Sequence, residues 1–387
     1  MKLGSFVGCM TGTSVDALDL ALIDVSHPNG PESSFNEEVT VTRAHTVPLP
    51  ESLRDALLAC GQPDRSSVDL LGRCDRLLGE FIGESITRWL HAIDVEPTSV
   101  TAIGSHGQTV RHRPPGSVDQ PFTLQIGDPN CIAELTGIDT IADFRRRDMA
   151  AAGQGAPLAP AFHRVLFGKL DGHLCILNIG GISNISPFGD HHGGFDVGPG
   201  NCLMDEWYAA HHTDDGAERY DASGAWAASG NVHDALLASL LKDPYLALNP
   251  PKSTGREYFN RAWLNPHLEQ TAGEIAKQDV QATLAEFTAI TIAEGIRKSL
   301  PDVSHVPVCG GGRLNTHLLQ RLVSALHARG HDLCVVKPTE YWGIDGDAVE
   351  AAAFAWLAYR RHYLLPGNMT EATGAKGPRV LGAIYPG

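Results

Sequence analysis

Two segments of this chain run as a β-strand, a short turn of glycine and small polar residues, and a second strand. The first covers residues 5–25 and the second residues 174–188, while a third strand at residues 306–309 leads into three consecutive glycines. Glycine lets backbone N–H groups turn toward one point and lets an anion approach the main chain closely. Such turns in both halves of a chain indicate a nucleotide polyphosphate held in a cleft between two related domains.

The length of the chain also indicates two domains. At roughly 100–200 residues per domain, 387 residues correspond to two, and with 43% hydrophobic residues each half can bury an ordinary core. The order hairpin, strand, helices occurs in both halves and predicts two mixed α/β domains with the active site between them. Residues 150–160, rich in alanine, glycine and proline, mark the crossing. We therefore expect domains at 1–145 and 146–387, with the C-terminal segment packing back on the first.

The formal net charge of −15 argues against a nucleic-acid partner, because nucleic-acid binding depends on clustered lysine and arginine. The one dense basic run, residues 145–147, is flanked by Asp143 and Asp148, which fits a small anionic ligand better than a polymer. The start of the chain lacks the apolar core of a secretory signal, and no apolar stretch of about 20 residues could span a bilayer. We therefore expect a cytoplasmic protein without a membrane partner.

The eight cysteines are scattered singly, mostly among apolar neighbours, and no C-x-x-C pair occurs. They are therefore expected to be small core residues rather than disulfide partners or zinc ligands.

Alternation and helical periodicity predict the other elements. Further strands are expected at 39–47, 100–104, 122–127 and 140–144. Helices are expected at 51–60, from Ser66 or Ser67 to about 94, from Asn130, and at 201–211, 231–242, 279–299, 313–328 and 346–362. The closing run, 364–387, has the composition of a loop.

The first hairpin turn has the composition of a phosphate-binding loop. It lacks the pattern G-x-x-x-x-G-K-[ST] and leads into a strand, so it is not a P-loop of that type. A phosphate-binding hairpin needs small residues with free N–H groups, a hydroxyl, and a carboxylate for Mg²⁺. The turn supplies these through Thr11, Gly12, Thr13, Ser14, Asp16 and Asp19. The alternative is an ordinary Gly/Asp hairpin turn.

Three further polar residues are candidates for binding a substrate. His106 lies between two glycines after an apolar strand, where a side chain often faces a ligand; a hydrogen-bonded turn histidine is the alternative. Arg145 begins a run of three arginines, each of which can bind a carboxylate or phosphate through two N–H groups, and an ion-pair network at a domain boundary is the alternative. Glu350 is the one acid on an alanine-rich helix, where a charge favoured by the helix dipole is the alternative.

Residues 193–207 are the most suggestive stretch chemically. Asp196 precedes a Gly-Pro-Gly turn and a helix expected from Asn201, and a carboxylate beside the backbone donors of a helix N-terminus stays ionised and fixed. This suits a general base that takes a proton from a hydroxyl or water. The alternative is a capping or turn aspartate. Asp205, inside the helix, competes as a carboxylate directed at a metal.

Two glycine turns complete the second half of the chain. In the second hairpin turn, the residues expected beside a phosphate are Asn178, Gly180 and Gly181. After the third strand come Gly310, Gly311 and Gly312. These glycines permit the flat approach of a base or ribose, and the helix that follows directs its N-terminus at any phosphate.

Together these stretches resemble the anhydro-N-acetylmuramic acid kinase family, which belongs to the fold superfamily of sugar kinases, actin and Hsp70 chaperones. The resemblance spans almost the whole chain through VGCMTGTSVDALD, GSHGQTVRH, LQIGDP, ELTGIDTIADFRRRD, GQGAPLAPAFH, LNIGGISN, FDVGPGN, PKSTGRE, CGGGRLN and EAAAFAWLA. It implies two actin- or ribonuclease-H-like α/β domains with mixed sheets around a central nucleotide cleft, and a homodimer.

The resemblance also implies an activity. The family uses ATP and Mg²⁺, opens the 1,6-anhydro ring of 1,6-anhydro-N-acetylmuramic acid with water, and phosphorylates O6, in peptidoglycan recycling. Its catalytic aspartate maps onto Asp196, and its sugar site maps near His106, Arg145 and Glu350. Its first phosphate loop maps onto residues 12–19, which adds Val15, Ala17 and Leu18 to the phosphate ligands. The Mg²⁺ ligands are expected among Asp16, Asp19 and Asp205.

The chain departs from the family's usual motifs in two places. MSGTS-x-DG reads MTGTSVDA, with Thr11 for serine and Ala17 for glycine, and GGQGAP reads AGQGAP, with Ala152 for the first glycine. Threonine keeps the hydroxyl, whereas Ala17 loses backbone freedom if φ must be positive there. No titrating group is lost, so we expect activity to persist.

Two other functions stay open. One is a kinase of the same fold that acts on an ordinary hexose, hexosamine or carboxylate. The other is a nucleotide-gated binding or chaperone module, which would need an appended peptide-binding domain. The motifs leave no free stretch of chain for such a domain.

Overall fold

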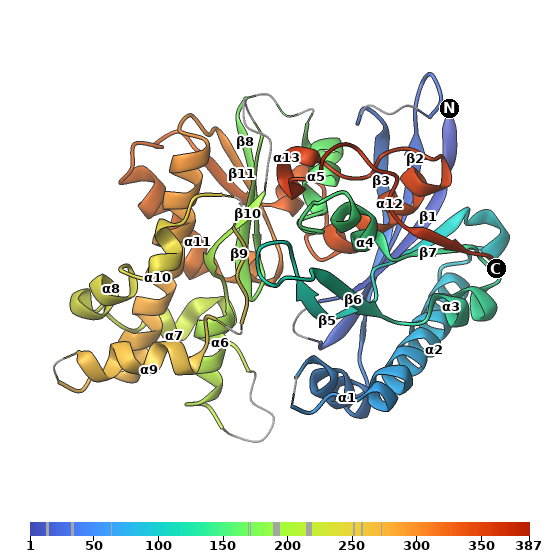
Figure 1. Cartoon of the computed structure of the whole chain (residues 1–387). Coiled ribbons are helices and arrows are strands. Elements are labelled where there is room, and N and C mark those ends of the chain that lie inside the picture. The colour runs from blue at the N-terminus through green and yellow to red at the C-terminus, as the bar shows by residue number, and fades with distance from the viewer. Residues whose placement is uncertain are drawn as a thin grey trace. The chain divides into compact units, whose positions relative to one another are not determined.

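A computed structural model describes residues 1–12, 15–31, 35–62, 64–168, 170, 172–188, 194–213, 219–250, 252–256, 258–271 and 273–387. The chain forms two compact units, Met1–Lys169 with Asp347–Gly387, and Leu170–Gly346. Each contains a mixed sheet and helices, which confirms the predicted α/β class (Figure 1). The division differs from the expected boundary after residue 145, because two helices at or beyond it pack on the first unit. α4 (Phe144–Ala150) packs on β6 (Phe122–Ile126), and α5 (Ala159–Phe167) packs on β3 (Glu38–Pro48) and α12 (Ala348–His362).

The first unit is built on a six-stranded sheet in the order β13-β7-β4-β1-β2-β3. Its strands are β1 (Lys2–Thr11), β2 (Ala17–Ser26), β3 (Glu38–Pro48), β4 (Ala102–Ser105), β7 (Thr140–Ala142) and β13 (Ala383–Tyr385). β1 to β3 form an antiparallel meander, and β4 and β7 continue the sheet in parallel from β1. A separate antiparallel pair consists of β5 (Gln108–Arg113) and β6 (Phe122–Ile126).

Helices pack on both faces of this sheet. On one face lie α1 (Glu51–Gly61) and α2 (Val68–Ala92), whose apolar side chains form a core with alternate residues of β1 and β2. Ser67 caps α2 as expected, since its hydroxyl accepts a hydrogen bond from the Leu70 N–H. α3 (Pro129–Thr136) packs against α2. This face therefore provides an ordinary hydrophobic core.

On the opposite face α12 (Ala348–His362) lies directly on the sheet. A Cβ added to Gly8 would be 1.8 Å from the Ala351 carbonyl oxygen, and one added to Gly104 would be 2.0 Å from that of Phe354. Only glycine fits at these two positions. α12 begins at the residues that carry Glu350, so this close packing fixes the place of Glu350 in the first unit.

The second unit repeats the topology of the first. Its sheet has the order β10-β9-β8-β11-β12, with β8 (Leu174–Ile179), β9 (Ile182–Phe188), β10 (Phe195–Pro199), β11 (His305–Cys309) and β12 (Val335–Pro338). β8 to β10 form an antiparallel meander, and β11 and β12 continue in parallel from β8. This is the arrangement of β1, β2, β3, β4 and β7, so the internal repeat predicted from the two hairpins is confirmed.

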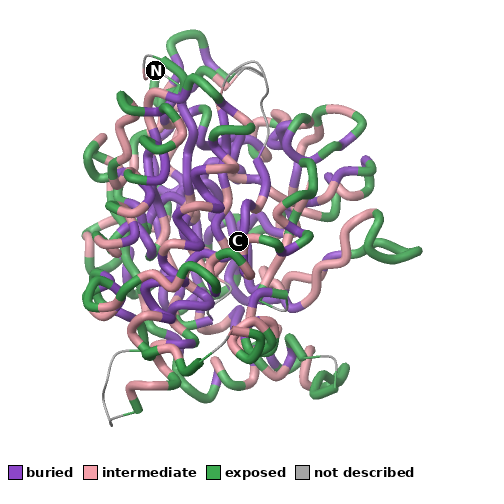
Figure 2. Tube along the Cα trace, turned by 90° about the vertical axis from the view of Figure 1, so that its left-hand side faces the viewer, coloured by how far each residue is buried: buried purple, intermediate pink, exposed green. Residues whose placement is uncertain are grey.

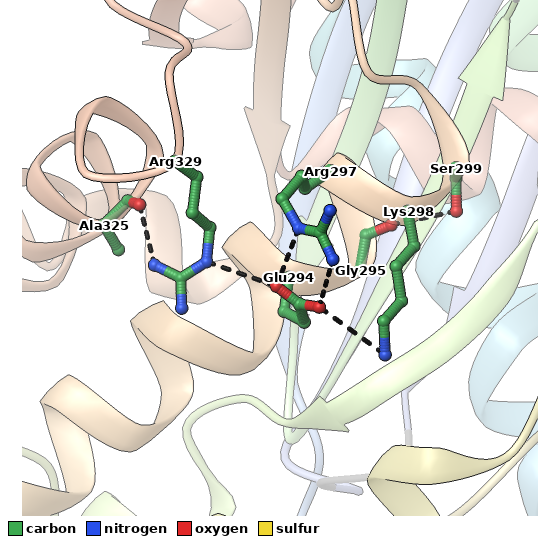
Figure 3. Close-up of polar contacts among 7 residues, drawn as sticks. All are labelled: Glu294, Gly295, Arg297, Lys298, Ser299, Ala325 and Arg329. Atoms are coloured by element: carbon green, nitrogen blue, oxygen red, sulfur yellow. Dashed lines mark hydrogen bonds and ion pairs between the residues drawn. The ribbon is translucent and has the colours of Figure 1, made fainter.

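Helices of the second unit surround α10 (Lys277–Ser299), which is buried along most of its length. The others are α6 (Cys202–Ala209), α7 (Ala225–Ala228), α8 (Asp234–Leu240), α9 (Arg261–Gln270) and α11 (Thr316–His327). Glu294 joins α10 to the C-terminal end of α11, because it accepts hydrogen bonds from Arg297 at 2.7 Å and from Arg329 at 3.3 Å (Figure 3). These bonds lower the pKa of Glu294 to about 2.

The composition of the closing run predicts a loop, but the structure shows regular elements within it. It contains α13 (Thr370–Thr373) and β13, which extends the first sheet beside β7. Its single short strand has too few residues for alternation to show.

Seven cysteines are buried and Cys334 is partly buried, and all eight are free, in agreement with the prediction. Buried residues lie along the strands and the helices that face them (Figure 2). No helix among the described residues combines the length and apolar character that a bilayer span requires.

Candidate functional site

Some side chains of the first hairpin turn are already hydrogen-bonded within the protein. Thr13 and Ser14 lie outside the described residues. The buried Thr11 hydroxyl donates to the Gly107 carbonyl at 3.1 Å, which ties this turn to the segment of His106. Asp19 accepts a hydrogen bond from the Thr46 hydroxyl at 2.7 Å.

Among the described residues of this turn, positive φ falls at Val15, with φ 53°, and not at Ala17, which is the first residue of β2. The alanine in place of the family's glycine is therefore compatible with the loop. The other departure is not neutral, since Ala152 has φ 67° in the left-handed region. A non-glycine residue there costs about 1–2 kcal/mol.

The three candidate sugar-site residues come together in the first unit. Arg145 donates from Nε and Nη2 to His106 Nε2 at 3.1 and 2.9 Å, and from Nη1 to the Gly155 carbonyl at 2.9 Å. Burial lowers the pKa of Arg145 to about 10, while the nearby charges of Glu350 and Asp148 raise it. Arg145 thus remains a cation, held between a histidine and two carboxylates.

The hydrogen bonds of His106 define its tautomer. Because Nε2 accepts from Arg145, the proton lies on Nδ1, which donates to the Gly107 carbonyl at 2.8 Å. Burial and the charge of Arg145 lower the pKa of His106 to about 3, so the ring is neutral. Both nitrogens are engaged within the protein. His106 therefore orients Arg145, and its ring nitrogens are not available to a sugar in this arrangement.

In the second unit Asp196 lies on β10, on the face opposite to the core residues Phe195 and Val197. Its Oδ2 accepts a hydrogen bond from the Thr254 N–H at 3.0 Å, and its own N–H donates to the Lys252 carbonyl at 3.3 Å. Residues 252–256 therefore run beside the start of β10. The side chain is only partly buried, so this carboxylate has a fixed position and access to solvent.

The expected reason for the fixed position of Asp196 is wrong. The backbone donors at the start of α6 do not hold this carboxylate, because they bind the second hairpin turn. Gly200 and Cys202 donate to the Gly181 carbonyl at 2.9 and 3.1 Å, and Asn201 donates to the Gly180 carbonyl at 2.8 Å. The carbonyls of Gly180 and Gly181 thus accept hydrogen bonds from the start of α6, and the second hairpin turn joins β8 and β9 to this helix.

The glycine run after β11 packs against the same hairpin. A Cβ on Gly310 would be 2.3 Å from Asn178 Oδ1, and one on Gly312 would be 2.2 Å from Ile179 Cγ2. A Cβ on Gly311 would meet only Asn201 Nδ2, at 3.9 Å. The candidate nucleotide residues of this unit therefore converge, and the space beside Gly311 is where a base or ribose could approach the backbone.

Arg256 is a candidate site residue that the sequence patterns did not single out. Its side chain crosses the second hairpin turn, since a Cβ on Gly181 would be 2.6 Å from its Nε. Arg256 is exposed, and no described residue accepts a hydrogen bond from its guanidinium. The signal was the PKSTGRE motif, which places lysine, hydroxyls, glycine and arginine in one short segment. An exposed arginine over a glycine turn is suited to binding an anion.

Asp205, in the first turn of α6, lies near Arg256. Burial raises its pKa to about 7; Arg256 opposes the rise and Asp221 adds to it. No described residue donates a hydrogen bond to its carboxylate. Asp205 is therefore a carboxyl group that can change its charge near neutral pH.

Comparison with known proteins decides the family. The protein family described as "Anhydro-N-acetylmuramic acid kinase" matches residues 4–387 of the chain. Relatives with this name include one from Saccharophagus degradans, 46% identical over the full length of both chains, and one from Pseudomonas paraeruginosa, 45% identical over the full length of both. A third, from Pasteurella multocida, is 44% identical over 98% of this chain and 96% of the relative.

The chain belongs to the anhydro-N-acetylmuramic acid kinase family. This confirms the resemblance found in the sequence motifs. It also confirms the expectation of a phosphotransferase that acts on an amino sugar.

Members of the anhydro-N-acetylmuramic acid kinase family are expected to use Mg²⁺, and the carboxylates of this chain differ in how well they suit this ion. Among the described residues no three His, Cys, Asp or Glu side chains gather as a ligand set. Mg²⁺ with nucleotides is usually held by one or two carboxylates, several waters and the phosphates themselves. Asp205, which lacks a hydrogen-bond donor among the described residues, fits that smaller requirement. Asp19 fits it less well because it is bonded to Thr46.

Proposed function

We propose that this chain opens the 1,6-anhydro ring of 1,6-anhydro-N-acetylmuramic acid with water and transfers the γ-phosphate of ATP to O6. The products are N-acetylmuramic acid 6-phosphate and ADP. The supporting observation is the segment of residues 252–256, which binds Asp196 through the Thr254 N–H at 3.0 Å and carries Arg256 over Gly181. A general base and an anion-binding cation on one segment suit a reaction that removes a proton and moves a phosphoryl group.

Asp196 is the general base of this proposal. As a water oxygen attacks C1, Asp196 takes a proton from the water, and the bond between C1 and O6 breaks through an oxocarbenium-like state. The electron pair released on O6 attacks the γ-phosphorus, and the bond from phosphorus to the bridging oxygen breaks to release ADP. The Thr254 N–H favours the ionised carboxylate, as a general base requires.

Arg256 and the glycine turns are the phosphate-binding groups. Because phosphoryl transfer depends mainly on positioning and charge stabilisation, a guanidinium aimed at the phosphate is worth more than a neutral donor. Asp205 would hold Mg²⁺ together with the phosphates, and the ion would supply further neutralisation of their charge. Arg256 and Asp205 are neighbours, so both would contribute to holding the same metal–phosphate group.

Arg145 and Glu350 are the sugar-binding residues of the first unit. Arginine has five N–H groups, and Arg145 uses three within the protein, so two remain for a carboxylate such as the lactyl group of the sugar. Glu350 is partly exposed and would accept a hydrogen bond from a hydroxyl or amide of the sugar.

The proposal extends to peptidoglycan recycling in the cytoplasm by a homodimer, as the family resemblance implies. Light scattering during size-exclusion chromatography tests the homodimer, with an expected mass of twice 41.4 kDa.

Mass spectrometry of the product formed from ATP, Mg²⁺ and the anhydro sugar in heavy-oxygen water tests the reaction. We expect one heavy oxygen at C1 together with a 6-phosphate. Unlabelled product incubated in the same water measures spontaneous exchange at C1. A phosphorylated product that keeps the anhydro bridge would contradict the ring opening. Faster ADP release with an ordinary hexose or hexosamine would instead favour a different acceptor.

A further inference from the structure

A fully buried carboxylate is connected to Arg145 of the candidate sugar site through one residue, Gly155. Asp148, on α4, has no exposed surface, and three donors surround it. Its Oδ2 accepts from the Gly155 N–H at 2.9 Å, and its Oδ1 accepts from Asn368 Nδ2 and from the Thr373 hydroxyl, both at 2.8 Å. A buried charge is tolerated only when it is hydrogen-bonded in this way. Asp148 therefore fixes the groups that donate to it.

The donors come from two segments that are far apart in the sequence. Gly155 belongs to the loop between α4 and α5, whereas Asn368 and Thr373 belong to the C-terminal part of the chain, and both are buried. Backbone bonds join the same segments, from the Gln154 N–H to the Thr373 carbonyl at 2.7 Å and from the Lys376 N–H to the Ala151 carbonyl at 2.8 Å. The loop is thus held on the C-terminal segment.

Gly155 transmits this arrangement to Arg145. Its N–H is bound by Asp148, and its carbonyl accepts from Arg145 Nη1 at 2.9 Å. Its φ of 71° suits glycine. On its other side Arg145 is held by the neutral His106. The direction of the two remaining N–H groups of Arg145 therefore depends on Gly155, and through it on Asp148 and the C-terminal segment.

We propose that Asp148, Asn368 and Thr373 are positioning residues that aim Arg145 at the carboxylate of an acidic sugar. The inference rests on the proposed function for the identity of that sugar. These residues do not touch the ligand. They determine the preference for a sugar with a lactyl carboxylate over the same anhydro sugar without one.

Thr373→Val tests this proposal, because valine keeps the buried volume and removes the hydroxyl, which donates to Asp148 at 2.8 Å and accepts a long hydrogen bond from the Ala375 N–H at 3.4 Å. We expect KM for 1,6-anhydro-N-acetylmuramic acid to rise roughly tenfold, as for loss of one hydrogen bond to a charged group. We expect KM for ATP and kcat to be unchanged. For 1,6-anhydro-N-acetylglucosamine, which lacks the lactyl group, kcat/KM should not change. Thr370→Val is the matched control, since that hydroxyl bonds only to the exposed Glu371.

A swap of the two polar partners gives a second readout. Asp148→Asn should weaken binding of the acidic sugar, and the double variant Asp148→Asn with Asn368→Asp should recover part of the loss, because a donor and an acceptor again face each other. Equal loss for both sugars in Thr373→Val, or no change in either, would overturn the positioning role. A wild-type protein that is inactive on the acidic sugar would overturn the proposed function itself, which separates the two failures.

Discussion

The two units share one sheet topology, but their candidate sites differ in how fully the polar groups are paired. In the first unit both nitrogens of His106 are engaged, and Arg145 makes three hydrogen bonds. In the second unit Arg256 is exposed without an acceptor among the described residues, and Asp205 has no donor among them. The same sheet topology therefore carries polar groups that are mostly hydrogen-bonded within the protein in the first unit, and charged groups that lack such partners among the described residues in the second.

This difference indicates a division of labour. A charged group whose orientation is fixed by its neighbours is suited to recognising a ligand of defined shape. Carboxylates and cations with open hydrogen-bonding positions are suited to moving protons and binding phosphate. We therefore propose that the first unit recognises the sugar and that the second unit carries out the chemistry.

The largest effect is expected from Asp196→Asn. If Asp196 is the general base, turnover should fall roughly 10²- to 10⁴-fold, the contribution of general-base catalysis, while binding of an ATP analogue is kept. Steady-state kinetics and calorimetry measure the two quantities. Asp234→Asn, at an exposed position on α8, is the control for loss of one negative charge. Turnover near the wild-type value would refute the assignment.

The next largest effect is expected from Arg256→Ala. Loss of a group that stabilises developing charge lowers kcat by roughly 10²-fold, and added guanidinium ions should restore part of the rate. Arg261→Ala serves as the control, because Arg261 is nearby in sequence but bonds to Asn265 and lies over Trp207. If Arg261→Ala lowers kcat as much as Arg256→Ala does, or if guanidinium restores neither, Arg256 does not bind the phosphate.

Asp205→Asn tests the uncommitted carboxyl group through pH. The pKa of Asp205 is about 7 in the folded protein, whereas its ordinary value is 3.8. At a pH between these two values the native state therefore keeps a proton that the unfolded state has lost. Stability from this group is therefore complete below about pH 4 and falls as pH rises toward 7. The variant should be more stable relative to wild type at about pH 8 than at about pH 5. Thermal unfolding at both values measures this, and a difference independent of pH would contradict it.

The smallest effect is expected from Ala152→Gly in the first unit. Relief of a left-handed alanine, less the flexibility of glycine, should stabilise the fold by roughly 0.5–1 kcal/mol. Ala150→Gly, at an exposed helical position two residues earlier, should destabilise it by a similar amount. Urea unfolding of both variants checks the opposite signs. A loss of stability in both would mean that the backbone at Ala152 is not strained.

The extent to which the sequence predicted this molecule follows the range of the interactions involved. Hairpins, the capped helix at Ser67 and the glycine run at 310–312 depend on local pattern, and the structure has them. The contacts of Asp148 with Asn368 and Thr373 join residues more than 200 positions apart, so no local pattern indicates them. The PKSTGRE motif contains Arg256, but the motif does not indicate that Arg256 lies over Gly181, because that contact joins distant parts of the chain.

The donors assigned to Asp196 illustrate the same limit. A Gly-Pro-Gly turn before a helix predicts free N–H groups, and the helix is present. The hairpin carbonyls of Gly180 and Gly181 occupy those groups instead, and the donor to Asp196 comes from Thr254. Composition shows which groups a segment offers, whereas only the fold determines which partner takes them.

Calorimetric titration of 1,6-anhydro-N-acetylmuramic acid into Asp196→Asn and Arg145→Gln most directly tests the separation of recognition from chemistry. We predict that Asp196→Asn binds the sugar with wild-type affinity although it is inactive, and that Arg145→Gln loses affinity for the sugar but keeps that for an ATP analogue. Wild-type sugar affinity in Arg145→Gln together with lost affinity in Asp196→Asn would contradict the account.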